Sequence, residues 1–221
     1  KSLVVGISGG IDSSVVSTLC ALTKRKTIVL SMPIKQIKLQ HDLSIEHGKW
    51  ISNKYKNVQH KVLELENLFS NFEKTLNEFN NEHGFANSRA RLRMTTLYQA
   101  AAANSGIVVG TGNKVEDFGV GFYTKYGDGG VDISPIADCN KSEVWELGKY
   151  LGINQKIIEA EPTDGLWNDG RSDTAQLGMS YVDLEKAMEN KNDPNYQKYL
   201  KIRKKNLHKM EPIPVCKFND S

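Results

Sequence analysis

The sequence predicts an α/β fold in which one parallel sheet is flanked by helices. Short apolar runs rich in Val, Ile and Leu alternate with longer segments that carry one apolar helical face. Most of these runs lack the alternation of a half-exposed sheet, which is typical of strands buried on both faces. The 221 residues suffice for one substantial core, so we expect a single domain over residues 1–221.

The composition argues against a membrane protein, a nucleic-acid-binding protein and a zinc-binding protein. The chain is 39% hydrophobic and 25% charged, as is ordinary for a soluble globular protein, and no apolar run approaches the ~20 residues of a membrane helix. The net charge of +3 is too small to indicate nucleic-acid binding. No signal peptide is evident, and Cys20, Cys139 and Cys216 fit no zinc spacing, so we expect a reducing cytoplasm.

The elements follow from periodicity and capping residues. Asp42 and Asn140 are the expected N-caps of two helices, and residues 80–84 are expected to form a loop. The predicted strands cover residues 3–7, 27–32, 58–65, 105–109 and 133–136. The predicted helices cover 15–22, 42–55, 68–79, 87–103, 140–151, a stretch from 180, and 196–207, whose basic residues are expected to be a solvated face.

The most informative stretch is Ser-Gly-Gly-Ile-Asp-Ser at residues 8–13, between the first predicted strand and the first predicted helix. Two glycines let the backbone pass close to a ligand and adopt positive φ. The N–H groups of the first helical turn have no intrahelical partner and lie at the positive end of the helix dipole. Such a turn binds phosphate or pyrophosphate.

This turn differs from the common phosphate loop, which has a lysine directly after its last glycine. Here Ile11 and Asp12 follow instead. A carboxylate beside a bound polyphosphate repels it unless a divalent cation lies between them, so Asp12 predicts a Mg²⁺ site. The alternative is an ordinary glycine-rich turn in which Asp12 is only an acid at a helix N-terminus.

A second glycine turn, Gly-Thr-Gly at residues 110–112, follows the predicted strand 105–109. It is expected at the carboxyl edge of the sheet, where parallel sheets bind ligands. Thr111 offers a hydroxyl, and Glu116 can supply a second carboxylate to the metal. The alternative for Glu116 is a plain first-turn helix acid.

Cationic residues follow in two further places. Arg91 shares a helical stripe with Thr95 and Tyr98, whereas Arg89 and Arg93 lie on the other side of the same helix. Three arginines within five residues repel one another, which predicts that some of them contact anions or carboxylates. The alternative is that they lie on a solvent-exposed side of the helix.

Residues 119–132 hold five glycines and three aromatics, which predicts an irregular loop around a flat ligand. In that loop Lys125 can meet an anion, and Asp128 and Asp132 can accept ribose hydroxyls; the alternative is a plain surface loop. Lys141 opposes the dipole of its helix, which favours a contact with phosphate, although exposed lysines at such positions are common.

Together these stretches resemble one known family. Residues 8–13, the Ser-Arg-Ala-Arg-Leu-Arg-Met run at 88–94, residues 110–116, and residues 122–132 running on to Lys141 are similar to the ammonia-dependent, single-domain NAD synthetases among the N-type ATP pyrophosphatases. The loop at 162–167 and His208-Lys209 also match, so the resemblance covers nearly the whole chain. The segment 116–121 is one residue longer than in some relatives, and the family's N-terminal helix is not present.

The resemblance implies a Rossmann-like fold of the adenine nucleotide alpha hydrolase type and an ATP-dependent amidation. Deamido-NAD would react with ATP to an acyl-adenylate, and ammonia would convert this to NAD, releasing AMP and pyrophosphate. A cytoplasmic homodimer is implied. Nothing resembles a glutaminase, so free ammonia or another chain supplies the nitrogen. The rival functions are another adenylating pyrophosphatase, such as a GMP-synthetase type, and a nucleotide-binding sensor without chemistry.

The resemblance also implies residue roles. Asp12 and Glu116 would bind Mg²⁺, and Asp12 and Lys141 would be catalytic. The chemistry of the ammonia step, rather than the resemblance, adds Asp173 to the catalytic set as a candidate base for ammonium, in a loop, 162–173, that can act as a lid. An exposed loop acid is the alternative reading of Asp173. The ATP contacts would be Gly6, Ile7, Ser8, Gly9, Gly10, Ile11, Asp12, Ser13, Thr111, Lys141 and Thr163. The deamido-NAD contacts would be Arg91, Lys125, Asp132, His208 and Lys209.

Overall fold

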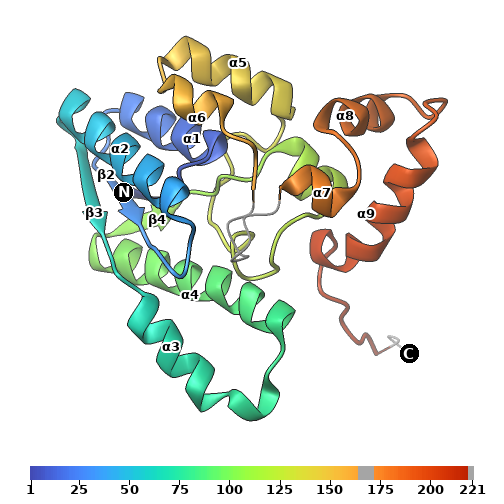
Figure 1. Cartoon of the computed structure of the whole chain (residues 1–221), viewed down its shortest axis with the longest axis horizontal. Coiled ribbons are helices and arrows are strands. Elements are labelled where there is room, and N and C mark those ends of the chain that lie inside the picture. Colours follow the sequence, from blue (N-terminus) through green and yellow to red (C-terminus); the bar gives the residue numbers. More distant parts are fainter. Residues whose placement is uncertain (164–171, 219–221) are drawn as a thin grey trace.

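The fold is built on four parallel strands in the order β3-β2-β1-β4 (Figure 1). The computed structural model describes residues 1–163 and 172–218. Val4 pairs with Ile28 on one side and with Val108 on the other, so β1 is central. The chain leaves β1 toward β2 and later returns to β4 on the other side, which makes the carboxyl ends of β1 and β4 the expected ligand crevice. The strands are β1 (Ser2–Gly6), β2 (Thr27–Ser31), β3 (Val58–Val62) and β4 (Gly106–Val108).

Helices cover both faces of this sheet, which confirms the predicted fold class. Side chains alternate along β1, because Leu3 and Val5 pack toward Val15 on one face while Val4 joins Phe69 and Ala101 on the other. The first face carries α1 (Ile11–Leu22), α2 (Lys38–Lys54), α5 (Lys141–Leu151) and α6 (Gln155–Glu159). The second face carries α3 (Glu66–Thr75) and α4 (Glu82–Ala103), joined by the 3-10 turn η1 (Asn77–Phe79).

A third packing group lies beside the carboxyl edge of the sheet, at the right of Figure 1. It comprises η2 (Lys114–Val120), α7 (Asp173–Leu177), α8 (Tyr181–Glu189) and α9 (Tyr196–Met210). Val115, Leu184 and Tyr199 are among its buried residues, and Trp145 packs against both this group and the core around α1. The space between the sheet edge and the third group is where the candidate site lies.

Four helices, α1 to α4, begin two to five residues earlier than predicted, and for α2 the capping residue differs as well. α2 begins at Lys38, so Asp42 is not its N-cap but lies in its second turn, where its carboxylate pairs with Lys38 at 2.6 Å. α4 begins at Glu82, because the Asn81 side chain accepts the N–H of Gly84 and caps a helix inside the predicted loop 80–84.

The predicted strand at 133–136 is wrong. Only one parallel bridge, between Val109 and Ile133, forms there, and Pro135 has no N–H to extend it. The third strand likewise ends at Val62 rather than at residue 65. Residues 114–120 form a π-helix, so the first two residues of the predicted irregular loop 119–132 are helical.

The hydrophobicity of the helices and the state of the cysteines can be compared with what the composition predicts. Within the described residues, no helix is both long enough and apolar enough to cross a membrane. Cys20 is buried, Cys139 is half-buried and Cys216 is exposed, and all three are free thiols.

Candidate active site

The turn between β1 and α1 is held in shape by its own side chains. Ser13 Oγ accepts the N–H of Ser8 at 3.2 Å and donates to the Gly10 carbonyl at 3.1 Å. Ser8 Oγ accepts the Gly10 N–H at 3.2 Å. Gly9 has φ of +94°, and a Cβ there would lie 2.4 Å from the Gln40 carbonyl oxygen. Glycine is therefore required by both backbone conformation and space, and α2 packs directly on the turn.

Three charged side chains from three elements meet at the mouth of this turn. Lys141 Nζ lies 2.5 Å from Asp12 Oδ2 and 2.8 Å from Glu116 Oε1. Lys141 is only 2% exposed although it lies in the first turn of α5. Its position against the helix dipole is offset by the two carboxylates. The three residues that the sequence nominated separately are thus in direct contact.

Asn113 connects the two carboxylates. It is fully buried, and its Nδ2 donates to Asp12 Oδ1 at 2.9 Å. Its Oδ1 accepts the N–H groups of Val115 and Glu116, both at 3.0 Å, and so caps η2. A single side chain therefore orients Asp12 and starts the helix that carries Glu116. Sequence reasoning passed over Asn113, although its type and its place before a helix are an N-cap signal.

Tyr181, at the start of α8, is the other supporting residue that sequence reasoning missed. Its hydroxyl lies 2.6 Å from Glu116 Oε1 and 2.8 Å from Asp173 Oδ2. Asp173 is therefore not the exposed loop acid of the alternative reading, since it is 4% exposed. No pattern in the sequence distinguishes Tyr181 from an ordinary core tyrosine.

The protonation of this cluster follows from its contacts. Burial lowers the pKa of Lys141, but the carboxylates of Asp12 and Glu116 outweigh burial, and the pKa ends above its ordinary value. Burial raises the pKa of Glu116, but the Lys141 ammonium and neighbouring donors outweigh it and lower the pKa. For Asp12 burial prevails over Lys141, and its pKa is raised. We expect Lys141 to remain cationic and to balance one of two carboxylates.

The cluster opens onto a cavity of about 870 Å³. Met32, Leu43 and Leu97 give one part of its wall an apolar character. Thr163 is held there by a hydrogen bond from the Gln40 side chain. The lining includes every residue nominated for ATP or catalysis, namely Gly6, Ile7, Ser8, Gly9, Gly10, Ile11, Asp12, Ser13, Thr111, Glu116, Lys141, Thr163 and Asp173.

Four of the five residues nominated for deamido-NAD also line the cavity: Arg91, Lys125, His208 and Lys209. Two of these cations are directed at backbone carbonyls. Lys125 Nζ donates to His208 O at 2.6 Å, and Lys209 Nζ donates to Gly121 O at 2.9 Å and Tyr123 O at 2.7 Å. These bonds fasten the loop after η2 to the end of α9.

Asp132 is not part of this lining. Its Oδ2 accepts the Val108 N–H at 2.7 Å and its Oδ1 accepts the Tyr98 hydroxyl at 3.1 Å. The side chain thus fastens its segment to β4 and α4. The three arginines of α4 separate as well, because Arg89 lies buried over the Phe69 ring, whereas exposed Arg91 approaches the Lys125 carbonyl at 3.4 Å.

Asp117 is an additional acid of the cavity wall that the sequence analysis did not nominate. Burial, with the carboxylates of Asp128 and Glu116, raises its pKa well above the ordinary value. Gly112 makes room for it, since a Cβ there would lie 1.9 Å from Asp117 Oδ2. The space left by the missing side chain of Gly112 is therefore occupied by the carboxylate of Asp117.

The remaining part of the expected lid, residues 164–171 with its Asp-Gly-Leu-Trp run, lies outside the described residues. The two described ends of that segment are joined, since the Asp173 N–H donates to the Pro162 carbonyl at 3.0 Å.

Comparisons with known proteins agree with this arrangement. The NH(3)-dependent NAD(+) synthetase of Archaeoglobus fulgidus is 34% identical over 99% of this chain and 89% of its own length. The solved NMN synthetase of Francisella tularensis superimposes with a TM-score of 0.89 at 29% identity, over 98% of this chain and 89% of that one. The NH3-dependent NAD synthetase of Campylobacter jejuni gives 0.76 at 26% identity, over 98% and 90%.

The family model for NAD synthase matches residues 1–216, which is nearly the whole chain and includes every charged residue of the site. A relative from Alkaliphilus metalliredigens, 38% identical over 96% of this chain and 89% of its own length, has the same name as the Archaeoglobus fulgidus protein. The chain belongs to the NAD synthase family.

Proposed function

We propose that the chain is a ligase that amidates deamido-NAD with ammonia at the expense of ATP, giving NAD, AMP and pyrophosphate. The observation that carries this proposal is the convergence of Asp12, Glu116 and Lys141 at the mouth of the glycine turn in a member of the NAD synthase family. The same reaction follows from the names of the related proteins, which are NH(3)-dependent NAD(+) synthetases.

The first step is adenylation of the nicotinate carboxylate. A carboxylate is a poor acyl donor because its leaving group would be oxide, whereas a mixed anhydride releases AMP. The nicotinate oxygen attacks the α-phosphorus of ATP, and the bond to the β-phosphate oxygen breaks as pyrophosphate leaves. Negative charge builds on the pyrophosphate, where the N–H groups at the start of α1 and the Lys141 ammonium stabilise it.

The donor set fits Mg²⁺. Asp12 and Glu116 present hard carboxylate oxygens from different elements to the same end of the cavity, and Mg²⁺ in such sites is held by one or two carboxylates plus substrate phosphates. When bound, the metal ion would neutralise charge on the triphosphate. Asp12 and Glu116 would hold it, and Lys141 would remain as the fixed cation beside them.

The second step is attack of ammonia on the acyl carbon. Ammonium predominates at neutral pH, so a carboxylate must take a proton from it. Asp173 lines the cavity and is buried beside Tyr181, which makes it our candidate for that base. One proton moves from the ammonium nitrogen to the carboxylate, and the nitrogen lone pair then attacks the acyl carbon. The bond from that carbon to the AMP oxygen breaks, AMP departs, and a second proton leaves the nitrogen to solvent as the amide forms.

A second substrate is favoured by one observation. The solved chain with a TM-score of 0.89 is described as an NMN synthetase, whereas the NAD synthetase of Campylobacter jejuni gives 0.76. NMN is the amide of nicotinate mononucleotide, so the chemistry at the carboxylate is unchanged and only the second nucleotide half of the substrate is missing. Nicotinate mononucleotide is therefore the alternative acceptor of the adenylyl group.

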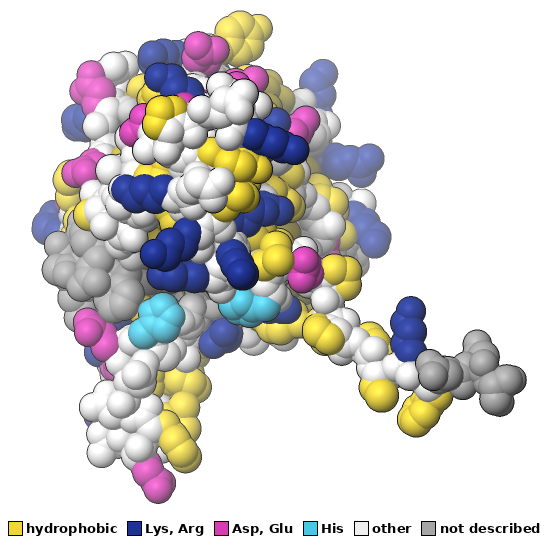
Figure 2. All heavy atoms as spheres, turned by 90° about the vertical axis from the view of Figure 1, so that its right-hand side faces the viewer, with side chains coloured by type: hydrophobic (Ala, Val, Ile, Leu, Met, Phe, Trp, Pro, Cys, Tyr) yellow, Lys and Arg dark blue, Asp and Glu magenta, His cyan; other side chains and the backbone are white. Residues whose placement is uncertain are grey.

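We further propose a cytoplasmic homodimer in which Arg91, Lys125, His208 and Lys209 contact deamido-NAD near the subunit interface. Asp132 is left out of this set, because its two oxygens are bonded to Val108 and Tyr98 and it does not line the cavity. The segment after α9 supports the dimer. Ile213, Val215 and Phe218 are 62%, 74% and 90% exposed on an arm that leaves the body of the molecule (Figure 2). Exposed apolar side chains on one arm are typical of a surface that a second chain covers.

The test is incubation with ATP, Mg²⁺ and ammonium plus either deamido-NAD or nicotinate mononucleotide. We expect AMP, pyrophosphate and the amide in equal amounts, with the faster acceptor identifying the substrate. Xanthosine monophosphate is the control for a GMP-synthetase type. AMP without amide formation, AMP only with xanthosine monophosphate, or ATP binding without turnover as in a sensor would each contradict the proposal.

A further inference from the structure

Tyr181 is held rigidly at the junction of the third packing group and the catalytic cluster. It is 5% exposed, and its ring meets the Trp145 ring edge-on at 6.0 Å between centroids and 89° between planes. Lys141 Nζ lies over the tyrosine ring, 5.0 Å from its centroid. Ser180 caps α8 directly before it. The hydroxyl therefore has little freedom to move.

This hydroxyl has one proton and two carboxylate neighbours. It lies 2.6 Å from Glu116 Oε1 and 2.8 Å from Asp173 Oδ2, so it donates to only one of them at a time. The shorter contact is to Glu116, and Lys141 Nζ reaches the same Oε1 at 2.8 Å. Two donors on one oxygen fix the rotation of the Glu116 carboxylate about its last bond.

We propose that Tyr181 is a positioning residue that orients Glu116, so that one carboxylate oxygen stays with the protein's own donors and the other is presented to the divalent cation. Mutation of a partner that orients a metal ligand typically costs about 10- to 100-fold in metal affinity or activity. The inference rests on the proposed Mg²⁺-dependent adenylation. It adds a residue from α8 to the group of Asp12, Glu116 and Lys141, which come from α1, η2 and α5.

The test compares Tyr181→Phe with Tyr199→Phe. Tyr199 is 8% exposed in the same packing group, and its hydroxyl makes no hydrogen bond within the described part of the chain. Mn²⁺ binding is measured by electron paramagnetic resonance with α,β-methylene ATP present, which does not require turnover. We expect about 10-fold weaker Mn²⁺ binding or more in Tyr181→Phe and less than 2-fold change in Tyr199→Phe.

A kinetic readout separates orientation of Glu116 from general loosening. In Tyr181→Phe the Mg²⁺ concentration for half-maximal pyrophosphate release should rise about 10-fold, while the KM for ATP at saturating Mg²⁺ changes less than 2-fold. Mn²⁺ affinity within 2-fold of wild type would overturn the proposal. So would equal rises in both kinetic constants.

Asp173→Asn provides a second variant, useful also if Tyr181→Phe folds poorly. Under the proposal Tyr181 still donates to Glu116, so Mn²⁺ affinity changes less than 2-fold. A loss of about 10-fold in Asp173→Asn would show that the effect runs through Asp173, and would overturn the assignment. Absence of AMP and amide from wild type contradicts the proposed function instead, so the two failures are distinguishable.

Discussion

The glycine turn carries a carboxylate, Asp12, instead of the lysine of the common phosphate loop, and the cation comes from elsewhere in the chain. Lys141 lies 129 residues further along the chain, yet its Nζ is 2.5 Å from Asp12 Oδ2. The loop therefore offers a carboxylate for a metal ion and keeps a buried cation beside it. Under the proposed function, this separation of charges would let a glycine turn without its own lysine hold a triphosphate.

The first residue-scale prediction concerns Asp12→Asn. The amide removes a negative charge from the metal site and one partner of the Lys141 ammonium, so pyrophosphate release should fall by at least about 100-fold. The matched control is Asp138→Asn, since Asp138 is exposed and pairs with Lys114 at 3.2 Å. A pyrophosphate-release assay that finds turnover retained in Asp12→Asn would remove Asp12 from the metal site.

The second residue-scale prediction concerns Gly9→Ala. Gly9 and Gly152 both have positive φ, +94° and +74°, but only Gly9 has a close neighbour, the Gln40 carbonyl. Gly152→Ala should lower the free energy of unfolding by about 1–2 kcal/mol through backbone strain alone. Gly9→Ala should lower it further through the clash. Urea denaturation that gives equal losses would contradict the close packing of α2 on the turn.

At the residue scale, the sequence predicts the charged residues of the site better than the uncharged residues that hydrogen-bond to them. Asp12, Glu116 and Lys141 were each nominated because a charge at that place needs a partner. Asn113 and Tyr181 carry no such signal, since their roles depend on contacts across 101 and 65 residues of sequence. For Lys209 the sequence predicts a contact with the ligand. It does not predict the hydrogen bonds that Lys209 Nζ donates to the carbonyls of Gly121 and Tyr123.

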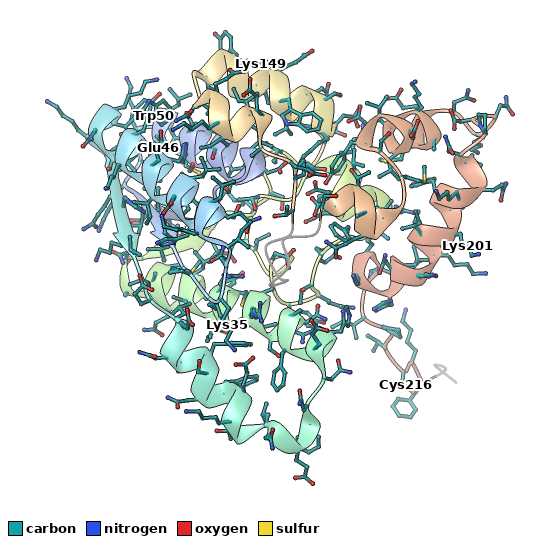
Figure 3. The ribbon with its side chains drawn as sticks, in the orientation of Figure 1. Lys35, Glu46, Trp50, Lys149, Lys201 and Cys216 are labelled. Atoms are coloured by element: carbon teal, nitrogen blue, oxygen red, sulfur yellow. The ribbon has the colours of Figure 1, made fainter. Side chains whose placement is uncertain are left out.

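At the scale of elements, α9 holds η2 in place. Carbonyls at the end of a helix lack intrahelical partners. Those of Phe118 and Gly119 accept from the Arg203 guanidinium, and that of Val120 accepts from Asn206 at 3.0 Å. The predicted solvated face is thus only partly correct. Figure 2 shows Lys and Arg side chains on this face, and Lys201 points outward from α9 in Figure 3.

The prediction for the contact between α9 and η2 is that Arg203→Met destabilises η2, the helix that carries Glu116. Loss of a charged donor to two carbonyls should lower the free energy of unfolding by about 1.5–3 kcal/mol. Pyrophosphate release should fall as well, because η2 carries Glu116. The exposed cation of the same helix, Lys204, gives the control Lys204→Met. Thermal denaturation in which both variants behave alike would contradict the role of Arg203.

A second prediction at this scale concerns the contact of α1 with α2. His47 is buried, and its Nε2 lies 2.8 Å from Ser17 Oγ. Burial, with His60 nearby, lowers the pKa of His47 from 6.5 to about 4. Between these values the unfolded chain therefore binds more protons than the folded chain. This contribution to stability is complete above pH 6.5, and about 3 kcal/mol is lost as the pH falls from 6.5 to 4.

The measurement is urea denaturation from pH 7 to pH 4. His47→Asn should flatten this pH dependence relative to wild type. Equal slopes in wild type and His47→Asn would show that other groups produce the loss of stability in acid.

Element boundaries were less predictable than element types. The apolar runs identify β1 and β2 because both are buried on both faces. The starts of α2 and α4 were placed late, since neither has an apolar stripe in its first turn. Residues 114–120 form a π-helix, and an irregular loop follows it. The glycine-rich composition of this stretch predicts the loop but not the π-helix.

At the scale of the whole molecule, the site lies where the two sheet faces and the third packing group meet. The turn after β1 supplies Asp12, the segment after β4 supplies Glu116, and α5 supplies Lys141. A parallel sheet brings the first two together because its strands end at one edge. The topology was predictable from the order of elements, but the packing of α7–α9 against that edge was not.

The central claim is that Asp12 and Glu116 hold a divalent cation on a triphosphate bound at the Ser8–Ser13 turn. The most direct test is a crystal structure of the whole chain with Mn²⁺ and α,β-methylene ATP, with the metal located by anomalous scattering. We predict an anomalous peak in contact with both carboxylates and the triphosphate on the N–H groups of α1. A peak remote from both carboxylates, with the nucleotide bound elsewhere, would contradict the claim.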